Sequence, residues 1–599
     1  MHAYIHDMLS PRDAAHLLTE IATLLELRGE RRAAIREFVS GARALATLDA
    51  ADVARLLSFG DDTRPSALGR APLNALRDML DTGDSPLLEQ LRESTPEGLL
   101  EMLRVPGLGT AKIHRIHQGL GIETLHELEQ AARDGRLESL PRFGARTAQK
   151  VLRGIASLRA SGARVLYPHA AREAARLLSA VRAHPGVIRA EVAGSLRRRC
   201  ETIADIDVVV AVRGIPSLVA TFFAHAPGVR EVMGGGGPTV SIRYDDGTRL
   251  DLRCVSEERF SVAWWWATGG REHCARVSAA AAARGIRIDS DEVRDATGQL
   301  IPIADERALY AAAALPWIAP ELRESLGEVE AAAAGTLPTL VVDDDIRGAL
   351  HCHSHYSDGT GTIAELATAA RARGWQYVGI SDHSQSASYA GGLTREAILR
   401  QHDDIDRVNA AMPGFRVLKG IEADILPCGR VDYDSGILDR FDYVIGSVHT
   451  RFGMNEVQMT DRVLKAMDDP HMTILGHPTG RLLLTREPYA VHIPALLERA
   501  GEVGVAVELN ADPHRLDLDW RHLREAHARG SVIEIGPDAH SVAGLDHVAL
   551  GVAVARKGWL SRDDILNARD VTAVLDFATA RRVSATHARA QMAGTTNAS

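Results

Sequence analysis

The chain has 599 residues, more than one hydrophobic core usually organises, so we expect several domains. It is 45% hydrophobic and 25% charged, and we recognise neither a signal peptide nor an apolar stretch near the ~20 residues of a membrane span. We therefore expect no membrane partner, and five scattered cysteines favour free thiols in a reducing cytoplasm over a disulfide framework.

The net charge of -10 argues against a nucleic-acid partner, but the charge is unevenly distributed. Residues 101–200 carry 18 basic and 8 acidic residues, a local charge of +10. A basic window in an acidic chain is a candidate surface for a phosphate backbone. A solvated arginine-rich face would have the same composition, so charge alone does not decide between the two interpretations.

Residues 14–58 and 86–160 have apolar residues at helical spacing. The second stretch is interrupted by "VPGLGTAK" (105–112) and "LPRFGARTAQK" (140–150). A glycine turn between two helices lets backbone N–H groups approach a DNA phosphate without reading bases. Either segment alone could be a capped helical turn, but two copies in the basic window favour tandem helix–hairpin–helix units. The candidate DNA-binding residues are Gly107, Gly109, Lys112, Gly144 and Lys150.

From about residue 165, predicted strands alternate with helices, beginning with "GSLRRRCETIADIDVVV" (194–210). A Gly-Ser turn offers backbone N–H groups and a hydroxyl to a phosphate. Asp205 and Asp207 alternate on a strand and so point the same way, and Asp251 follows on a later apolar strand. A lone Asp-x-Asp pair is weak evidence, but three carboxylates beside such a turn favour a two-metal site for phosphoryl or nucleotidyl transfer.

After a predicted linker at 319–344, seven strand-like runs alternate with helical stretches, which predicts a parallel sheet or barrel. Nearly every run ends on His, Asp or Glu, and a β/α barrel brings such ends together at one face. The strand-end residues are His351, His353, Asp358, His383, Glu422, His449, His477, Asp538 and His540. Any single one could be an ordinary core residue, whereas nine together predict more than one divalent ion. We expect His355 to be a bystander or to support a ligand without binding metal itself.

"LHCHSHYSDG", "GISDHS", "GIEADI", "GSVH", "GHPTGRLL" and "GPDAHS" resemble the motifs of PHP (polymerase and histidinol phosphatase) domains. The resemblance implies a distorted (β/α)7 barrel over about 345–580. It also implies that the nine strand-end residues bind a cluster of two to three ions, expected to be Mn²⁺ or Zn²⁺. One departure is Ala349, where the family usually has an Asp that orients a ligand.

The Gly-Ser turn with its three aspartates resembles the nucleotidyltransferase palm of family X DNA polymerases. The resemblance implies two Mg²⁺ or Mn²⁺ ions on the catalytic residues Asp205, Asp207 and Asp251. "WWWATGG" (264–270) matches the family segment beside the nucleotide sugar, although core packing is the expected role of at least one tryptophan. By this resemblance the dNTP-binding residues are Gly194, Ser195, Arg198, Trp266 and Gly269.

Three positions differ from the usual nucleotide pocket of that family. Trp266 and Ala267 stand where Tyr and Phe are usual, and Cys274 stands where an Asn usually touches the base. A further hairpin expected near 58–82 is poorly formed in the sequence. No lysine precedes Lys112, and Ala75 takes the place of the family's Schiff-base lysine, so we expect no lysine-dependent lyase activity from residues 1–90.

The order of these motifs resembles bacterial and archaeal family X DNA polymerases with a C-terminal PHP domain, a multidomain α+β and α/β chain. The expected domains are an N-terminal helical domain (1–85), a helix–hairpin–helix subdomain (86–160), a palm with a mixed sheet (161–255), a nucleotide-binding subdomain (256–318), the linker (319–344), the PHP domain (345–580) and a disordered tail (581–599).

The resemblance implies a monomeric, cytoplasmic, nucleoid-associated repair polymerase that fills short gaps. Its partners would be gapped or primed DNA and dNTPs, and its PHP domain would be a metal-dependent 3′→5′ exonuclease or phosphoesterase. Three alternatives stay open at this point: a nuclease with a weak or inactive palm, a non-catalytic DNA-end binder, and, for the PHP half alone, a small-molecule phosphatase.

Overall fold

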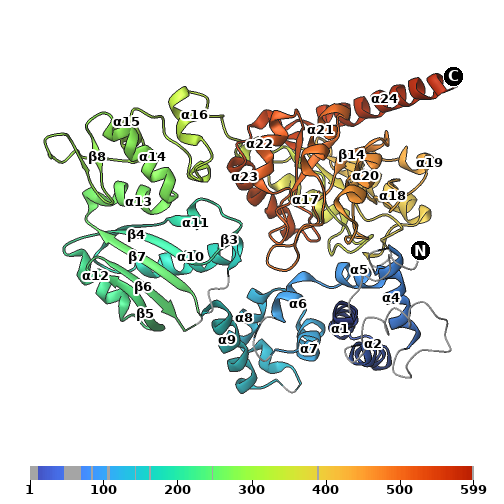
Figure 1. The fold of residues 1–599 in the computed structure, drawn as a ribbon, viewed down its shortest axis with the longest axis horizontal. Coiled ribbons are helices and arrows are strands. Elements are labelled where there is room, and N and C mark those ends of the chain that lie inside the picture. Colours follow the sequence, from blue (N-terminus) through green and yellow to red (C-terminus); the bar gives the residue numbers. More distant parts are fainter. Residues whose placement is uncertain are drawn as a thin grey trace. The chain divides into compact units, whose positions relative to one another are not determined.

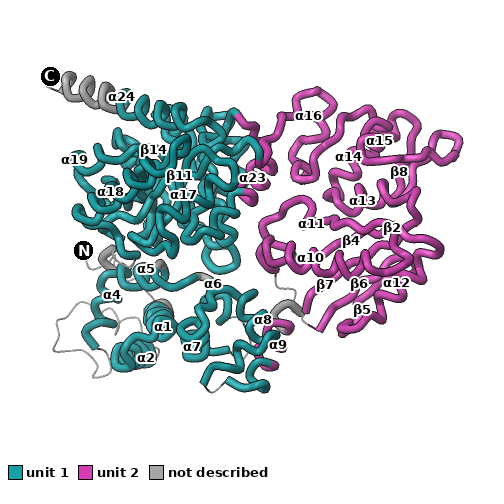
Figure 2. The backbone as a smooth tube through the Cα atoms, turned by 180° about the vertical axis from the view of Figure 1, so that it is seen from behind, with its two compact units in different colours: residues 1–148, 344–548, 563–599 teal, residues 149–343, 549–562 magenta. Residues whose placement is uncertain are grey.

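The computed structural model describes residues 11–45, 69–82, 85–103, 105, 108–141, 143–160, 164–245, 247–387 and 390–596. The chain divides into two compact units, which Figure 2 distinguishes by colour. The first contains residues 1–148, 344–548 and 563–599, and the second contains residues 149–343 and 549–562. Among the described residues, no helix is long and apolar enough to cross a membrane.

The N-terminal part of the chain is helical, as predicted (Figure 1). Its helices are α1 (Pro11–Arg28), α2 (Arg32–Leu45), α4 (Arg70–Thr82), α5 (Pro86–Glu93), α6 (Glu97–Met102), α7 (Thr110–Leu120), α8 (Leu125–Arg133), η3 (Arg136–Ser139) and α9 (Ala145–Ala160). Local signals fix several ends: Thr124 and Glu127 form a capping box at α8, and α7 ends at Gly121, whose φ of 62° favours glycine. Much of the poorly formed hairpin near 58–82 lies outside the described residues, which include only its helix α4.

The two predicted glycine turns precede α7 and α9 and share one hydrogen-bonding pattern. In each turn, the N–H of the residue before the helix-capping glycine, Gly109 or Gly144, donates to the carbonyl of the residue three positions earlier. The carbonyl of that glycine accepts from an N–H of the following helix. These bonds join Leu108 to Val105 and Ile113 to Gly109 in the first turn, and Phe143 to Leu140 and Ala148 to Gly144 in the second, at 3.0 to 3.1 Å. The second, less regular sequence therefore folds like the first.

The predicted seven-stranded parallel barrel is confirmed, with its strands side by side in chain order. The strands are β10 (Gly348–Ala349), β11 (Tyr377–Ile380), β12 (Arg416–Asp424), β13 (Tyr443–Ser447), β14 (Met472–Leu475), β15 (Ala506–Asn510) and β16 (Ile533–Gly536). A parallel bridge between Cys352 and Ala539, which follow the first and last strands, nearly closes the barrel. The strands are almost wholly buried, which explains their continuous apolar runs.

Helices connect the barrel strands and follow the last one. They are α17 (Ile363–Ala372), α18 (Arg395–Ala411), α19 (Ser435–Leu438), α20 (Glu456–Met467), α21 (Ile493–Val503), α22 (Trp520–Ala528), α23 (His547–Lys557) and α24 (Val571–Thr596). The described part of the expected disordered tail, residues 581–596, is helical and continues α24. Its Ala and Arg residues have high helix propensity. The expectation of disorder rests on the small and polar side chains of this segment, which do not exclude a helix.

The second unit contains a five-stranded mixed sheet in the order β2-β4-β7-β6-β5, which confirms the mixed sheet predicted for the palm. The strands are β2 (Val187–Val192), β4 (Ile206–Val212), β5 (Val229–Gly236), β6 (Thr239–Tyr244) and β7 (Arg249–Val255). Only the central pair β4 and β7 is parallel. Helix α10 (Tyr167–Arg182) packs on β2, and α12 (Pro216–Ala224) packs on β6 and β7 (Figure 1).

A helical subdomain follows the sheet, with α13 (Phe260–Thr268), α14 (Arg271–Ala282), α15 (Glu306–Ala312), η5 (Pro320–Leu322) and α16 (Glu328–Ala334), and with the short strands β8 (Arg287–Ile288) and β9 (Val293–Arg294). Leu322, Val329 and Ala332 are buried in the same core as Trp265. The expected linker 319–344 is therefore largely part of this subdomain, because its alanines pack as a helix instead of spacing two domains.

Candidate functional site

The structure brings the three predicted palm aspartates together. Asp207 and Asp251 are in register on the parallel strands β4 and β7, and Asp205 precedes β4 by one residue. The guanidinium of Arg249 lies 3.7 Å from the carboxylate of Asp205 and donates to Asp251 at 3.1 Å. Burial, together with the carboxylates of Asp205 and Asp251, raises the pKa of Asp207 to about 7. Neighbouring carboxylates repel one another, and a bound cation would relieve this repulsion.

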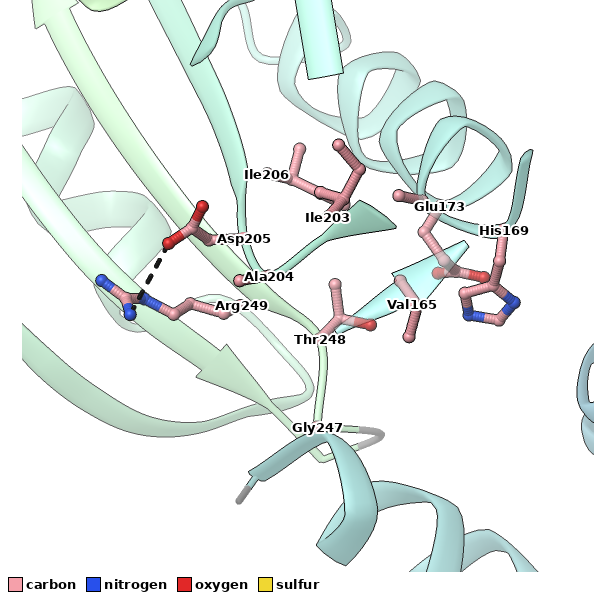
Figure 3. A pocket seen from close by; sticks show the side chains of 11 residues that line it. Val165, His169, Glu173, Ile203, Ala204, Asp205, Ile206, Gly247, Thr248 and Arg249 are labelled. Carbon is pink, nitrogen blue, oxygen red and sulfur yellow. Dashed lines mark ion pairs between the residues drawn. The ribbon is translucent and has the colours of Figure 1, made fainter. Parts of the chain in front are cut away.

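Arg249 was not predicted from the sequence, although it alternates with Asp251 on β7 and so shares its face. Arg249 and Asp205 line a cleft of about 360 Å³. Figure 3 shows this cleft, with the Asp205–Arg249 ion pair on one side and His169 and Glu173 of α10 on the other.

The Gly-Ser turn packs directly against the carboxylate of Asp207 and forms the short helix α11 (Gly194–Arg197). A Cβ atom on Gly194 would lie 1.7 Å from Oδ2 of Asp207, and the φ of this residue is +57°. Only glycine fits both conditions. Ser195 is half-buried in the same turn. Of the five predicted nucleotide-binding residues, Gly194 therefore lies against Asp207, and Ser195 follows it in the same turn.

The consecutive arginines of the turn differ in their surroundings. Arg197 forms a bidentate pair with Glu306 at 2.7 and 3.0 Å and lies over the ring of Trp264, which gives it a structural role. Arg198 donates to Glu324 at 3.1 Å and to the carbonyl of Thr268 at 2.8 Å. Of the two, only Arg198 was predicted to bind a nucleotide.

The tryptophan segment has mixed roles. Trp265 is fully buried in the subdomain core, as expected for at least one tryptophan, whereas Trp266 is half-buried against that core. Gly269 ends α13, and a Cβ there would lie 2.6 Å from the sulfur of Cys274. Cys274 is itself 3% exposed, so its thiol fills space in the core of this subdomain.

The nine residues predicted to bind metal converge at the carboxyl ends of the barrel strands. Eight of them form three overlapping groups whose candidate ligand atoms lie within 4.8 Å of one another. The groups are His353, Asp358, His383 and His540; His351, His353 and Asp538; and His383, Glu422 and His449. The ninth, His477, has its Nε2 atom 2.9 Å from Glu422. His355 is exposed beside Tyr356 and belongs to none of the groups found among the described residues.

Glu422, fully buried at the end region of β12, is the centre of this cluster. Its carboxylate oxygens lie 2.9 Å from Nδ1 of His383, 3.2 Å from Nε2 of His449 and 3.4 Å from Nε2 of His351. Facing imidazoles hold the pKa of Glu422 well below its usual range, although burial opposes them. The ionised carboxylate would therefore hold metal ions together with these histidines.

The chemistry of the donors fits divalent metal ions. The Nε2 atom of His351 and both ring nitrogens of His353 are buried and make no well-formed hydrogen bond to a described residue. Buried polar atoms almost always have a partner, and metal ions would supply it here. Mixed imidazole and carboxylate ligands suit zinc, manganese or iron. Burial opposes protonation of His449, but Glu422 and Asp424 raise its pKa to about 10, so a bound cation must displace a proton.

Several residues that orient the ligands were missed from the sequence. Glu508 on β15 lies 2.5 Å from Nδ1 of His351, and Asp424 on β12 lies 2.8 Å from Nδ1 of His449. Ala349 is buried and offers no carboxylate, so Glu508 supplies the orienting acid at His351. Each of these acids is a charged residue within a mainly apolar predicted strand, and this feature could have identified both as functional residues.

Glu508 and its neighbour Glu534 give a matched test of this orienting role. We expect Glu508→Gln to weaken Mn²⁺ binding by about 10- to 100-fold, because the imidazole of His351 loses its carboxylate partner. Burial and Glu508 hold the pKa of Glu534 well above its usual range, and neither of its carboxylate oxygens makes a well-formed hydrogen bond to a described residue, so Glu534→Gln should change Mn²⁺ binding little. Calorimetric titration of metal-free protein measures both; equal losses in the two variants would contradict the assignment.

The candidate metal-binding cluster opens into a cleft of about 570 Å³. Phe452, Arg486 and Arg515 line this cleft together with the predicted ligands. Arg515 also lies 3.3 Å from Asp538. The cleft therefore combines candidate metal ligands with cationic and aromatic groups, a combination suited to a phosphoester substrate.

The described residues of the two glycine turns are accessible. Gly109, Lys112, Gly144 and Lys150 are exposed, and a Cβ atom on either glycine would meet nothing within 4 Å. The fifth predicted residue, Gly107, lies outside the described residues. A phosphate backbone could therefore approach the described glycine of each turn closely.

Three family models match the chain: a SAM-like helix-hairpin-helix tandem at residues 99–157, the DNA polymerase beta thumb at 263–324 and the PHP domain at 349–512. A probable phosphatase of Syntrophotalea carbinolica is 29% identical over 38% of this chain and 94% of its own length. A probable phosphatase of Thermoanaerobacter sp. (strain X514) is 26% identical over 36% of this chain and 89% of its own length.

One relative matches nearly the whole chain. The DNA polymerase/3′-5′ exonuclease PolX of Bacillus subtilis (strain 168) is 36% identical over 570 residues, which cover 94% of this chain and 99% of that protein. The matched regions include the helix–hairpin–helix tandem, the thumb and the PHP barrel described above. The chain therefore belongs to the bacterial family X DNA polymerases that carry a C-terminal PHP domain.

Proposed function

We propose that this chain is a DNA-directed DNA polymerase that fills short gaps in repair, and that its PHP domain is a metal-dependent 3′→5′ exonuclease. The observation that carries the proposal is the presence of two separate candidate metal centres in one chain. One is the aspartate triad beside the Gly-Ser turn, and the other is the buried His, Asp and Glu cluster of the barrel.

In the polymerase reaction, the primer 3′-hydroxyl attacks the α-phosphate of a dNTP, a new P–O bond forms and pyrophosphate leaves. Asp205, Asp207 and Asp251 would hold Mg²⁺ or Mn²⁺ ions, which stabilise the attacking and leaving oxygens when bound. Ser195 and Arg198 would contact the triphosphate. Half-buried Trp266 and the cap residue Gly269 would border the nucleotide.

In the exonuclease reaction, water attacks the phosphorus of the terminal phosphodiester and the P–O3′ bond breaks, so the shortened primer keeps a 3′-hydroxyl and a nucleoside 5′-monophosphate is released. The nine residues of the barrel cluster would hold two to three Mn²⁺ or Zn²⁺ ions, which activate water and neutralise the phosphodiester when bound. Arg486 and Arg515, which line the same cleft, would attract the DNA phosphates.

DNA binding is assigned to the two glycine turns within the basic window. Gly107, Gly109 and Gly144 would let backbone N–H groups reach phosphates, with Lys112 and Lys150 supplying charge. This contact reads no base sequence, as gap filling requires. A monomeric enzyme located in the cytoplasm with the nucleoid is part of the same proposal.

The test uses wild-type protein and a 5′-labelled primer in a gapped duplex, in Mn²⁺ or Mg²⁺. The proposal predicts that the primer lengthens to the end of the gap with dNTPs and shortens without them. Shortening alone would favour the nuclease alternative, and binding without turnover in any divalent metal would favour the DNA-end binder. Hydrolysis of a small phosphate monoester with intact DNA would favour the phosphatase.

The raised pKa of Asp207 predicts a pH dependence for primer extension. The metal-free triad holds a proton on Asp207 up to about pH 7, and a binding Mg²⁺ ion must displace it. We therefore expect the Mg²⁺ concentration for half-maximal extension to rise by up to about ten-fold per unit as pH falls below 7, and to level off above 7. Mg²⁺ titrations from pH 5.5 to 8.5 measure this; a flat profile would contradict the assignment.

A further inference from the structure

Residues 549–562 follow the last barrel strand in the sequence but belong to the second compact unit (Figure 2). Their backbone pairs with residues 340–341, through a bridge between Ser561 and Leu340 and an N–H from Val341 to the carbonyl of Leu560 at 3.0 Å. Trp559 packs against the core of the helical subdomain. A segment from the C-terminal part of the chain thus belongs to the second compact unit, which also contains the aspartate triad.

Lys557 is the most enclosed charged group of this segment. Its side chain is 1% exposed, and its ammonium group forms an ion pair with Glu324. The same Nζ atom donates to the carbonyl oxygen of Arg198 at 3.2 Å and lies 3.9 Å from the sulfur of Cys200. Lys557 therefore reaches the end of the Gly-Ser turn, and it is one of only five lysines in a chain that otherwise uses arginine.

Glu324 connects this lysine to the arginine of the turn. Its Oε1 atom accepts from Nε of Arg198 at 3.1 Å as well as from Lys557. Although burial opposes ionisation, Lys557 and Arg198 keep the pKa of Glu324 below its usual value. One ionised carboxylate is thus shared by two cations in a largely buried place, where charges interact strongly.

The shared carboxylate decides how much positive charge an anion would meet at the turn. With Lys557 present, two cations face one carboxylate, so the cluster keeps one net positive charge. Without it, Glu324 would neutralise Arg198 and hold its guanidinium more tightly. Arg198 also donates from Nη1 to the carbonyl of Thr268 at 2.8 Å, which leaves fewer N–H groups for a ligand. The triphosphate would therefore compete with Glu324 for the other N–H groups of Arg198.

We propose that Lys557 is a positioning residue for nucleotide binding: it holds Glu324 so that Arg198 keeps its charge and its donors for the triphosphate of a dNTP. The inference rests on the proposed polymerase function. It makes the C-terminal segment, which carries no residue of the aspartate triad, a part of the nucleotide site.

The first test is Lys557→Met, a long apolar side chain that keeps most of the packing volume. We expect its KM for dNTP in gap filling, and its Kd for radiolabelled dATP in Ca²⁺ by equilibrium dialysis, to rise by at least about ten-fold. The kcat should change less than about three-fold, because the aspartate triad is untouched. Lys557→Arg, which restores the cation, should return both constants to near the wild-type values.

The second test removes the carboxylate. In the double variant Lys557→Met, Glu324→Gln, Arg198 no longer faces an unbalanced acid, so KM and Kd should return toward wild type. A merely structural role would make the double variant as poor as the single one, and that result would overturn the inference. Unchanged constants in Lys557→Met would also overturn it. If Lys557→Met does not fold, Glu324→Gln alone should lower Kd for dATP, and an increase would contradict the inference.

The two proposals fail in different ways. Wild-type protein that never extends a primer would contradict the polymerase function, whereas the equilibrium binding of dATP still tests Lys557. Wild-type extension with unaltered constants in Lys557→Met would contradict the inference alone. The exonuclease rate without dNTPs reports on the folded barrel, and it should be the same in all of these variants.

Discussion

Asp207→Asn is expected to lower primer extension by at least about a thousand-fold, because metal ions contribute several kcal/mol to such transfers and each ten-fold in rate is about 1.4 kcal/mol. Asp207 packs against Gly194 of the Gly-Ser turn, and it is in register with Asp251 on the neighbouring strand. The amide is nearly the same size as the carboxylate, so the sheet should fold unchanged. Single-nucleotide gap filling under single-turnover conditions measures the loss.

The matched control is Asp245→Asn, an exposed aspartate of the same subdomain that lies just after β6. This variant should extend primers at the wild-type rate. The exonuclease rate of Asp207→Asn should also stay within about two-fold of wild type, because independent sites give additive effects. Extension by Asp207→Asn within ten-fold of wild type would show that the triad does not carry the transfer.

Glu422→Gln is expected to remove the exonuclease activity and most of the bound metal. Its carboxylate lies within hydrogen-bonding or ion-pairing distance of several imidazoles of the cluster and would hold metal ions together with them. We expect a loss of at least about a thousand-fold in the rate of primer shortening, for the same reason as at the palm. Elemental analysis of the purified protein measures its metal content independently of activity.

The control for Glu422→Gln is His355→Ala. His355 lies in the same histidine-rich segment as His351 and His353, but its side chain is exposed beside Tyr356. This variant should keep the metal content and exonuclease rate of the wild type. Full metal content with normal shortening in Glu422→Gln would contradict the assignment of the barrel cluster as the nuclease centre.

Much of the barrel site could be predicted from the sequence, because parallel strands joined by helices bring their carboxyl ends to one face. The positions of His, Asp and Glu at those ends are enough to expect one cluster. The orienting acids could not be assigned in this way. Glu508 contacts His351 from 157 positions away in the chain, and the contact depends on how far the barrel closes.

The palm was predictable for a different reason, because the alternation of Asp205 and Asp207 defines one face of a strand. Strand alternation does not separate the neighbouring arginines, so Arg198 was chosen by the family resemblance alone. In the structure, Arg197 contacts Glu306 and Arg198 contacts Glu324, two acids distant in the chain. The role of Lys557 could not be predicted either, because its partners lie more than 200 positions away in the chain.

The most direct test of two separate active centres is a single assay of wild-type protein, Asp207→Asn and Glu422→Gln on one 5′-labelled gapped duplex, with and without dNTPs. We expect wild type to lengthen the primer with dNTPs and to shorten it without them. Asp207→Asn should only shorten the primer, and Glu422→Gln should only lengthen it. If wild type only shortened the primer, and only Glu422→Gln abolished this, the palm would not be a polymerase centre.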